Sequence, residues 1–428
     1  MDAQSMIVAL LAQFAPCFTK PGYEQFKTLM LSRMGLLGLP HCVTELMRIS
    51  GVYKQKHWTT PYAFLRKGRF SCKELSQVLL DLLAQALGLG EEFIIAIDDT
   101  LVKKTGKQFF GLGYYRDPTD KHPGAHQRKV RGHCWLVLAL LLERGTSCLA
   151  FPLATRLFVP EARAQKDWVF KTKIELAECL LKRFRWPAKR LILLVDNLYA
   201  KGKLAFDLGL AQSVSMVSRL RSNAALYELP KPAKQAKRGR PRLRGKKVSA
   251  RTLYRRRRKH RQLNVTLYGK TITIKAFVDV VMPSPTLGSQ PILVIIFPQR
   301  SHKKMNIFFS TNLKMDPVRL LELYALRFKI EDAFDELKTF GGFADCRQRS
   351  FSALTRHATF SLIAYSLLRL LSIRLPQAEA IEAVPWWQPK GPPSVTRLRR
   401  ALAKALPFPG RLLKSDKPGN NSSLEFTA

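Results

Sequence analysis

The spacing of apolar residues divides the chain into a helical first part and a later part that contains short apolar runs. Within the first 90 residues, apolar side chains recur three and four positions apart, with Pro and Gly between the groups. This spacing predicts helices at 5–18, 23–39 and 71–90. Residues 41–58 fit either a small DNA-binding helical unit or a part of a plain helical bundle.

From residue 91 the pattern becomes that of an α/β domain. Short apolar runs predict strands at 91–100, 132–142, 147–158, 190–197 and 213–221. Helical spacing predicts helices at 161–184 and 198–210. Strands that come first, followed by strands that alternate with helices, indicate an α/β fold with a mixed sheet.

A third pattern begins after about residue 220. A polar, strongly basic tract is followed by β-like runs at 263–269, 271–281, 291–297 and 306–311, and residues 267–272 are typical of a hairpin. Helical spacing returns at 324–338 and 351–373. From about residue 376 the chain is rich in Pro, Lys and Arg, which predicts a loose tail.

The charge of the chain narrows the class of partner. Lys and Arg number 72 and Asp and Glu 31, which gives a net charge of +41. Because such an excess repels itself, we expect a polyanionic partner, with nucleic acid ahead of a membrane surface. The longest apolar run, 134–142, is too short to span a bilayer. No basic stretch precedes the first apolar run, so we expect no signal peptide.

Cysteine usage points to a reducing compartment. The seven cysteines are scattered singly along the chain, and no CxxC pair occurs. This pattern argues against a zinc ribbon and against a disulfide framework.

Residues 324–338 carry an unusual set of polar side chains for a single helix. At about 100° per residue, Tyr324, Arg327, Glu331 and Lys338 fall within an arc of about 60°. The apolar stripe of the same helix adjoins this arc, so the polar groups would lie at the edge of the core. An ordinary amphipathic helix with charges four and seven positions apart explains the same pattern equally well.

Two predicted strands supply further carboxylates. Asp98 and Asp99 end one apolar run and Asp196 ends another. Ligands commonly bind outside the carboxyl ends of strands in α/β sheets. Together with Glu331 these residues would form an oxygen-only site, which suits Mg²⁺ or Mn²⁺. Two such ions about 4 Å apart can support phosphodiester chemistry.

These motifs resemble those of the DDE transposases of bacterial insertion sequences. The resemblance is to the group with a Tyr-Arg-Glu-Lys signature, in which two, three and six residues separate the four positions. Tyr324, Arg327, Glu331 and Lys338 match that spacing, and the segments around Asp98 and Asp196 match the two aspartate motifs in order and type. The resemblance covers about residues 90–345. It implies an α/β ribonuclease H-like catalytic core with a mixed sheet, interrupted by a β-rich insertion and preceded by a helical N-terminal domain.

The resemblance also implies a division of the chain. We expect a helical N-terminal domain that is a candidate for DNA binding (1–90), the first part of the catalytic core (91–220), a basic β-rich insertion (221–312), the helical end of the core (313–375) and a basic Pro-rich tail (376–428).

The implied roles follow the motifs. Asp98 or Asp99, Asp196 and Glu331 would be catalytic and would hold two Mg²⁺ or Mn²⁺ ions, while Tyr324, Arg327 and Lys338 would hold the DNA backbone. Asp335, one turn after Glu331, is the alternative third carboxylate.

Asp98 and Asp99 compete for the first metal position. The aspartate of the family motif usually stands two residues before a Thr, as Asp98 stands before Thr100, whereas relatives with an acidic residue before the catalytic Asp favour Asp99. Side chains of neighbouring strand residues point to opposite faces, so both cannot share one role. We expect the Asp98 carboxylate to converge with those of Asp196 and Glu331, and Asp99 to turn outward and cap a turn.

The resemblance predicts a transposase that binds element ends, cleaves DNA in a metal-dependent reaction and transfers the strand to a target. The alternatives are a catalytically silent DNA-binding protein of the same fold and a hydrolytic nuclease without strand transfer. Expected partners are element ends and target DNA, with a homodimer on DNA and no membrane. The expected location is the bacterial cytoplasm, in association with the nucleoid.

Two further features concern DNA. Arg238 and Arg240 belong to an Arg-Gly-Arg-Pro sequence that resembles an AT-hook, which binds a narrow minor groove, although a plain basic loop fits as well. Relatives that cut through a DNA hairpin often keep a tryptophan in the insertion, and none lies between Trp186 and Trp386. Tyr254 or Tyr268 would have to replace it.

Overall fold

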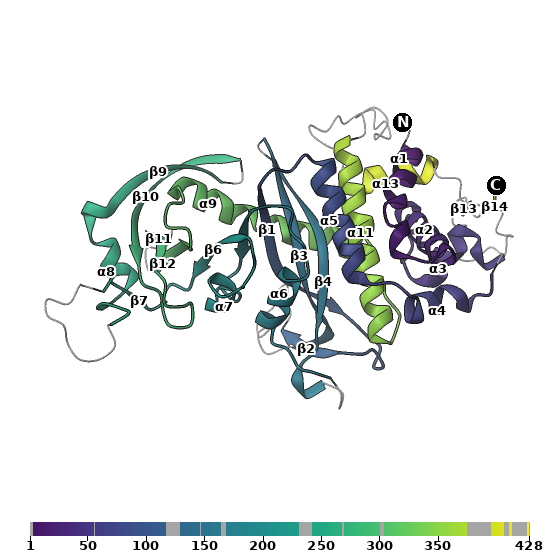
Figure 1. Cartoon of the computed structure of the whole chain (residues 1–428), viewed down its shortest axis with the longest axis horizontal. Coiled ribbons are helices and arrows are strands. Elements are labelled where there is room, and N and C mark those ends of the chain that lie inside the picture. Colours follow the sequence, from purple (N-terminus) through teal and green to yellow (C-terminus); the bar gives the residue numbers. More distant parts are fainter. Residues whose placement is uncertain are drawn as a thin grey trace.

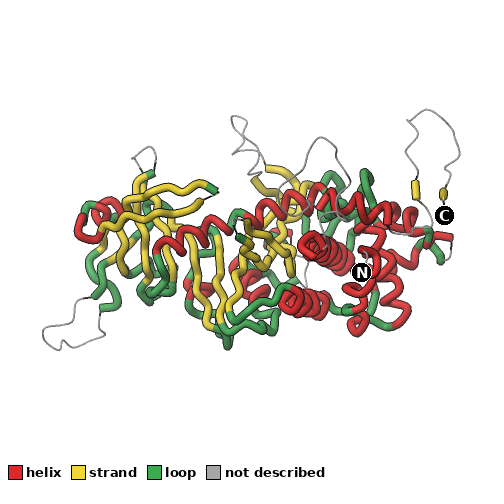
Figure 2. The backbone as a smooth tube through the Cα atoms, turned by 90° about the horizontal axis from the view of Figure 1, so that it is seen from above, coloured by secondary structure: helices red, strands yellow, loops and turns green. Residues whose placement is uncertain are grey.

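The computed structural model places helices at one end of the molecule and strands through its middle to the other end (Figure 1). It describes residues 3–54, 56–116, 129–145, 147–163, 168–230, 242–267, 269–299, 304–374 and 395–405, and the pairs 411–412 and 426–427. Viewed from above, the same division between strands and helices is visible (Figure 2).

Ten strands form one mixed sheet within the described residues. The strand order is β2-β3-β1-β5-β6-β12-β11-β10-β9, and β4 pairs with β3. β1 is parallel to β5 and β5 to β6, and the other pairs are antiparallel. The strands are β1 (Glu92–Lys103), β2 (Gly113–Arg116), β3 (Lys129–Arg144), β4 (Ser147–Phe158), β5 (Arg190–Val195), β6 (Ser213–Leu220), β9 (His260–Leu267), β10 (Lys270–Val281), β11 (Ile292–Pro298) and β12 (Met305–Ser310). The predicted mixed α/β architecture is thus confirmed.

The strands after residue 220 extend this sheet. β12 pairs with β6 in antiparallel orientation, so β9–β12 continue outward from the central strands. The hairpin predicted at 267–272 joins β9 and β10, with Lys270 opposite Leu267. Two short strands, β7 (Leu226–Tyr227) and β8 (Lys247–Val248), form a separate pair. α8 (Ala250–Tyr254) packs on β10, β11 and β12.

Helices cover both faces of the central strands. α5 (Cys72–Ala86), α10 (Lys329–Thr339) and α11 (Phe351–Arg374) pack on β4, and α6 (Lys173–Leu181) packs on β3 and β4 from the other side (Figure 1). α9 (Pro317–Leu326) contacts β6, β9 and β12.

α11 lies between the sheet and the N-terminal helices. It contacts β4 on one side and α1 (Ala3–Ala12), α2 (Lys20–Gly35) and α4 (Thr59–Lys67) on the other. Most of its residues are therefore buried around its whole circumference, as expected for a helix without a solvent face. α3 (Val43–Ser50) packs on α2 and α4. The helices predicted at 23–39 and 71–90 correspond to α2 and α5, whereas the helix predicted at 5–18 ends at Ala12 and is followed by the 3-10 turn Ala15–Cys17. None of the described helices has the length and apolar character needed to cross a bilayer.

Three further predicted helices differ from those in the structure. The helix predicted at 161–184 is only the turn Glu161–Arg163 and α6, because Thr172 and Glu175 form a capping box that starts the helix at Lys173. The helix predicted at 198–210 is reduced to the single turn α7 (Gly202–Ala205). The third, 324–338, is divided in two at the candidate site. Within the predicted tail, α13 (Val395–Ala405) forms a helix that packs on α2 and α11.

The loop after α10, residues 340–346, is held by two buried arginines and a half-buried lysine from three distant segments. Arg33 of α2, Arg399 of α13 and Lys104 after β1 each donate a hydrogen bond to a carbonyl oxygen of this loop. Gly342 in the loop has φ +68° and lies directly against His41. The position of α10 is thus tied to both ends of the chain.

Gly342→Ala should destabilise the protein more than the same change at Gly38. Both glycines have a left-handed backbone, which costs an alanine about 1–2 kcal/mol. A methyl group at residue 342 would lie 2.3 Å from the His41 Cβ, whereas at residue 38 it would meet nothing within 4 Å. We expect an additional loss of about 1–3 kcal/mol for Gly342→Ala in urea unfolding. Equal losses of unfolding free energy for the two variants would show that the loop accommodates the added methyl group without an energetic penalty.

Candidate active site

Asp98, Asp99 and Asp196 lie where the parallel pairing of β1 and β5 ends. The last paired residues are Ile97 and Val195, on strands about 4.8 Å apart, so Asp98 on β1 and Asp196, the first residue after β5, directly follow this pair. Asp98 and Asp99 were expected at the end of a strand. This was wrong, because β1 continues to Lys103 through its antiparallel pairing with β3.

The two neighbouring aspartates point to opposite faces of the sheet. The Oδ2 atom of Asp98 accepts a hydrogen bond from Arg327 Nη1 at 2.6 Å, on the side of α10. The Oδ2 atom of Asp99 lies 2.6 Å from Lys173 Nζ, and its Oδ1 accepts a bond from the Tyr199 hydroxyl at 2.7 Å, on the side of α6. The alternation of side chains along β1 is the cause.

Arg327 connects the sheet to the helix that carries Glu331. Its Nη1 bonds to Asp98 and its Nη2 donates to Glu331 Oε1 at 2.7 Å. The guanidinium therefore lies between the two carboxylates, in the planar fork arrangement that suits such pairs. Its side chain is 13% exposed, so the bridge is largely shielded from water.

The chain changes its helical geometry at this bridge. α9 ends at Leu326 and α10 begins at Lys329, in place of the single predicted helix. In the first turn of α10, the amide groups of Ile330 and Glu331 donate to the carbonyl oxygens of Arg327 and Phe328, at 3.1 and 3.0 Å. Such i to i+3 bonds tighten the turn.

Burial and charge oppose each other at Asp98. Burial raises the pKa of Asp98 to about 7, although the positive charge of Arg327 acts to lower it; Glu331 adds to the rise. Burial lowers the pKa of Arg327, but the carboxylates of Asp98 and Glu331 outweigh this effect and raise it overall. The carboxyl group of Asp98 is thus poised to gain or lose a proton near neutral pH.

Tyr324 lies on the same side as Asp196. Its ring meets Phe308 edge-on at 5.0 Å, and the Arg327 guanidinium lies 5.8 Å from the ring centre. Burial raises the pKa of the Tyr324 hydroxyl, Arg327 lowers it and the carboxylate of Asp196 raises it. The structure therefore brings Tyr324, Arg327, Glu331, Asp98 and Asp196 into one neighbourhood.

Other predicted residues are farther away or outside the described chain. Lys338 is half-buried on α10, about 10 Å along the helix axis from Glu331. Asp335 is exposed on the same helix. Arg238, Arg240 and Tyr268 lie outside the described residues.

Sequence reasoning missed the polar cluster on the far face of β1. Tyr199 is fully buried, and Lys173 and Cys134 also contact Asp99. Asp99 was expected to cap a turn, and its actual partners come from β3, from the start of α6 and from the loop after Asp196. In the sequence, the position of Tyr199 three residues after Asp196 was the feature that could have indicated this polar cluster.

The donor chemistry at the candidate site fits a hard divalent cation. Asp98, Asp196 and Glu331 offer only carboxylate oxygens, which are the ligands that Mg²⁺ and Mn²⁺ prefer. Within the described residues, no group of three or more His, Cys, Asp or Glu side chains is close enough to hold a metal ion. Arg327 supplies the positive charge between Asp98 and Glu331 in this arrangement.

Comparison with protein families identifies the chain as a nucleic-acid-cleaving enzyme. The family model described as DDE superfamily endonuclease matches residues 24–276, more than half of the chain. The protein therefore belongs to the DDE superfamily endonucleases. The match includes Asp98 and Asp196 and ends before Tyr324. A search of curated proteins gave no match.

Tyr199→Phe should cost about 1.5–3 kcal/mol of unfolding free energy, because the buried hydroxyl donates to a carboxylate. Tyr115→Phe is the matched control, since its hydroxyl donates to the neutral carbonyl oxygen of Phe158 at 3.3 Å and should cost about 0.5–1.5 kcal/mol. Urea unfolding measures both. If Tyr199→Phe lowers the unfolding free energy no more than Tyr115→Phe does, the hydrogen bond from Tyr199 to Asp99 does not stabilise the fold as expected.

The stability of the metal-free protein should depend on pH through Asp98. Its pKa is about 7 in the folded state and about 4 in the unfolded chain. The folded state binds more protons between these values, so this contribution to stability is present below pH 4 and is lost as pH rises towards 7. Asp98→Asn should flatten the dependence, and Asp335→Asn, an exposed change on α10, should leave it. Unfolding curves in EDTA at pH 4.5–7.5 that stay parallel for wild type and Asp98→Asn would refute this.

Proposed function

We propose that this DDE superfamily endonuclease is a transposase that cuts DNA at the ends of a mobile element and joins the freed strand to a target. The observation that carries the proposal is the Asp98–Arg327–Glu331 bridge, with Asp196 on the adjacent strand. It unites the aspartate motifs with the Tyr-Arg-Glu-Lys stretch, which lies beyond the segment matched by the family model.

The strand arrangement supports a ribonuclease H-like core. Antiparallel strands β4, β3 and β1 are followed by the parallel strands β5 and β6, with helices on both faces. The candidate carboxylates stand on the two central neighbours of this set, β1 and β5. The residues from β7 to β12 then form the proposed insertion between β6 and α9.

Asp98, Asp196 and Glu331 would hold the two divalent ions. When bound, these ions supply Lewis-acid stabilisation of the charge on the reacting phosphate. The buried carboxyl group of Asp98 must lose its proton to serve as a ligand, so metal affinity should rise with pH through about 7. Arg327 would turn from its carboxylate partners toward a DNA phosphate, which its planar fork can bind.

Tyr324 and Lys338 would position the DNA backbone on the same side. Tyr324 is half-buried next to Arg327, and Lys338 lies two turns along α10 from Glu331. Fourteen residues separate them, about 21 Å along the helical segment, so they would contact phosphates that are several nucleotides apart. Two element ends must be held together for joining, so we propose a homodimer on DNA.

A hydrolytic nuclease remains the second candidate, because cutting and joining use the same carboxylates. The assay uses purified protein, Mg²⁺ and a supercoiled plasmid that carries the element ends, and it measures nicked and joined products separately. Joined products support a transposase. Nicks without joined products would overturn strand transfer and leave the endonuclease activity.

The same assay tests the carboxylates. Asp98→Asn and Glu331→Gln should reduce cutting by more than about a hundredfold, because an amide is a poor ligand for a hard cation. Asp99→Asn should cost less, since its carboxylate contacts Lys173 and Tyr199 on the other face. Asp335→Asn, an exposed change one turn after Glu331, is the matched control and should cut normally. Near wild-type cutting by Glu331→Gln would exclude Glu331 as the third ligand.

A further inference from the structure

Arg219 on β6 faces the same side of the sheet as the first candidate aspartate. Ala96, Leu194 and Val217 are directly paired across β1, β5 and β6. Two residues later, β1 carries Asp98 and β6 carries Arg219. Side chains two residues apart on a strand point to one face, and neighbouring strands are about 4.8 Å apart. Arg219 therefore lies on the face of Asp98, two strand spacings or about 10 Å away.

The contacts of Arg219 place its guanidinium beside Tyr324. Arg219 is directly opposite Phe308 on β12, and its guanidinium lies 6.0 Å from the centre of the Phe308 ring. Tyr324 meets the same ring edge-on, with ring centres 5.0 Å apart. Burial raises the pKa of the Tyr324 hydroxyl, and the positive charge of Arg219 is close enough to act against this rise. Arg219 therefore lies in the neighbourhood that Tyr324 shares with the candidate carboxylates.

No carboxylate balances the charge of Arg219 in the described part of the chain. Its Nη2 donates a hydrogen bond to the amide oxygen of Asn306 at 3.2 Å. Asn306 and Phe308, two residues apart on β12, are both neutral and hold the guanidinium from one side. Arg327 differs, since it pairs with two carboxylates. A guanidinium has five N–H donors, so most of those of Arg219 are available to an anion.

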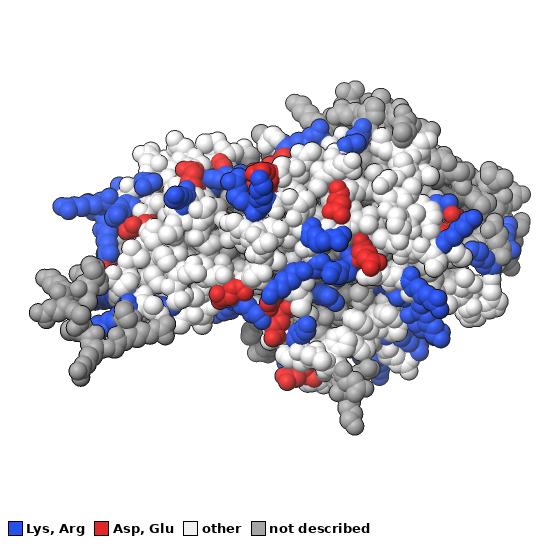
Figure 3. All heavy atoms as spheres, viewed as in Figure 1, with Lys and Arg blue, Asp and Glu red and all other residues white. Residues whose placement is uncertain are grey.

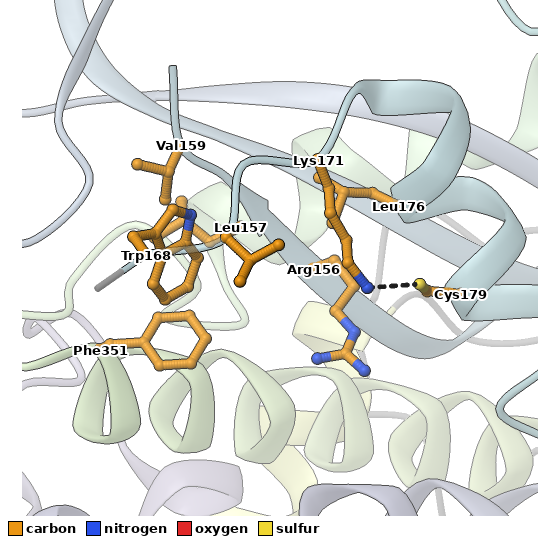
Figure 4. A pocket seen from close by; sticks show the side chains of 9 residues that line it. Arg156, Leu157, Val159, Trp168, Lys171, Leu176, Cys179 and Phe351 are labelled. Carbon is orange, nitrogen blue, oxygen red and sulfur yellow. Dashed lines mark hydrogen bonds between the residues drawn. The ribbon is translucent and has the colours of Figure 1, made fainter. Parts of the chain in front are cut away.

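Position distinguishes Arg219 from the other basic residues more than charge does. Lys and Arg side chains gather in several places on the face shown in Figure 3. The pocket in Figure 4, beside Trp168, is also basic, because Arg156 and Lys171 line it. The register puts Arg156 on the face of Asp99, away from the candidate carboxylates. DNA at those carboxylates would lie on the side of Arg219 and not on the side of this pocket.

We propose that Arg219 is a further DNA-binding residue of the candidate active site and binds a phosphate beside the one that is cut. This inference rests on the proposed function, because it takes the candidate carboxylates as the place of cutting. A guanidinium fork can donate two hydrogen bonds to phosphate oxygens at once. The neutral contacts of Asn306 and Phe308 hold the fork without neutralising it. Arg219 thus offers the DNA a positive charge that the candidate carboxylates do not already balance.

Arg219→Gln should weaken DNA binding and make it less sensitive to salt. The assay uses the full-length protein in EDTA, so that nothing is cut, and follows the anisotropy of a fluorescent duplex that carries an element end at about 50–200 mM salt. Loss of one charge-assisted phosphate contact should raise the Kd about tenfold or more. It should also lower the slope of log Kd against log salt by about 1, because one fewer counterion is released.

Arg190→Gln is the matched control for the loss of one positive charge. Arg190 begins β5, about 20 Å from Asp196, and it is exposed and pairs with Glu92. The Kd and the salt slope of this variant should equal those of the wild type. Arg219→Lys keeps the charge and loses the fork, so it should keep the salt slope and bind DNA with an intermediate Kd.

Asn306→Asp separates a DNA contact from a structural role. The new carboxylate would pair with Arg219, which should hold the arginine at least as firmly and leave the Tm unchanged or higher. The same pair should balance the charge that the DNA needs, so the Kd should rise although Arg219 is still present. In the Arg219→Gln background, the same change should have a smaller effect on the Kd.

An unchanged Kd and an unchanged salt slope in Arg219→Gln would overturn the proposal. A lower Tm of Arg219→Gln with a wild-type salt slope would also overturn it, because the arginine would then support only the fold. An Asn306→Asp effect on the Kd that is equally large without Arg219 would show general repulsion of DNA and overturn it as well. Failure of the proposed function is seen separately, as normal plasmid cutting by Asp98→Asn and Glu331→Gln, in an assay that does not measure the Kd.

Discussion

The guanidinium of Arg327 is the contact on which the arrangement of the candidate site depends. It joins a strand in the middle of the sheet to a helix more than 200 residues later in the chain, through Asp98 at 2.6 Å and Glu331 at 2.7 Å. Without its positive charge, two carboxylates would face each other in a partly dry environment, which is unfavourable. During catalysis, a pair of divalent ions would supply this positive charge between the carboxylates.

The rest of the fold holds the two sides of this bridge in place. β1 is fixed between β3 and β5, while the far face of its aspartate pair is held by Lys173 and Tyr199. α10 is fixed by the loop 340–346, which receives hydrogen bonds from both ends of the chain. Since the carboxylates sit on rigid elements, small changes in these supports should alter their spacing and therefore the chemistry.

The excess basic residues are distributed over several parts of the molecule. Part of it lies at the bridge, and part lies in the cleft beside Trp168, which Arg156 and Lys171 line. A further run, Arg255, Arg256, Arg257, Arg258 and Lys259, is exposed before β9. A polyanion that follows the surface could meet these groups in turn, because each contact releases counterions and adds affinity without reading sequence.

The sequence by itself determined every strand of the sheet except β2, several of the helices and the class of chemistry. Apolar runs are local signals, and the spacing of Tyr324, Arg327, Glu331 and Lys338 is a property of one segment. Helix limits at 161–184 and 198–210 failed, since a capping box and tertiary packing decided them. Only the tertiary structure decided that Asp98 faces Arg327 and that Asp99 faces Lys173. The run before the aspartates is apolar on both faces, so no alternation in the sequence could show which side of the strand each carboxylate would take.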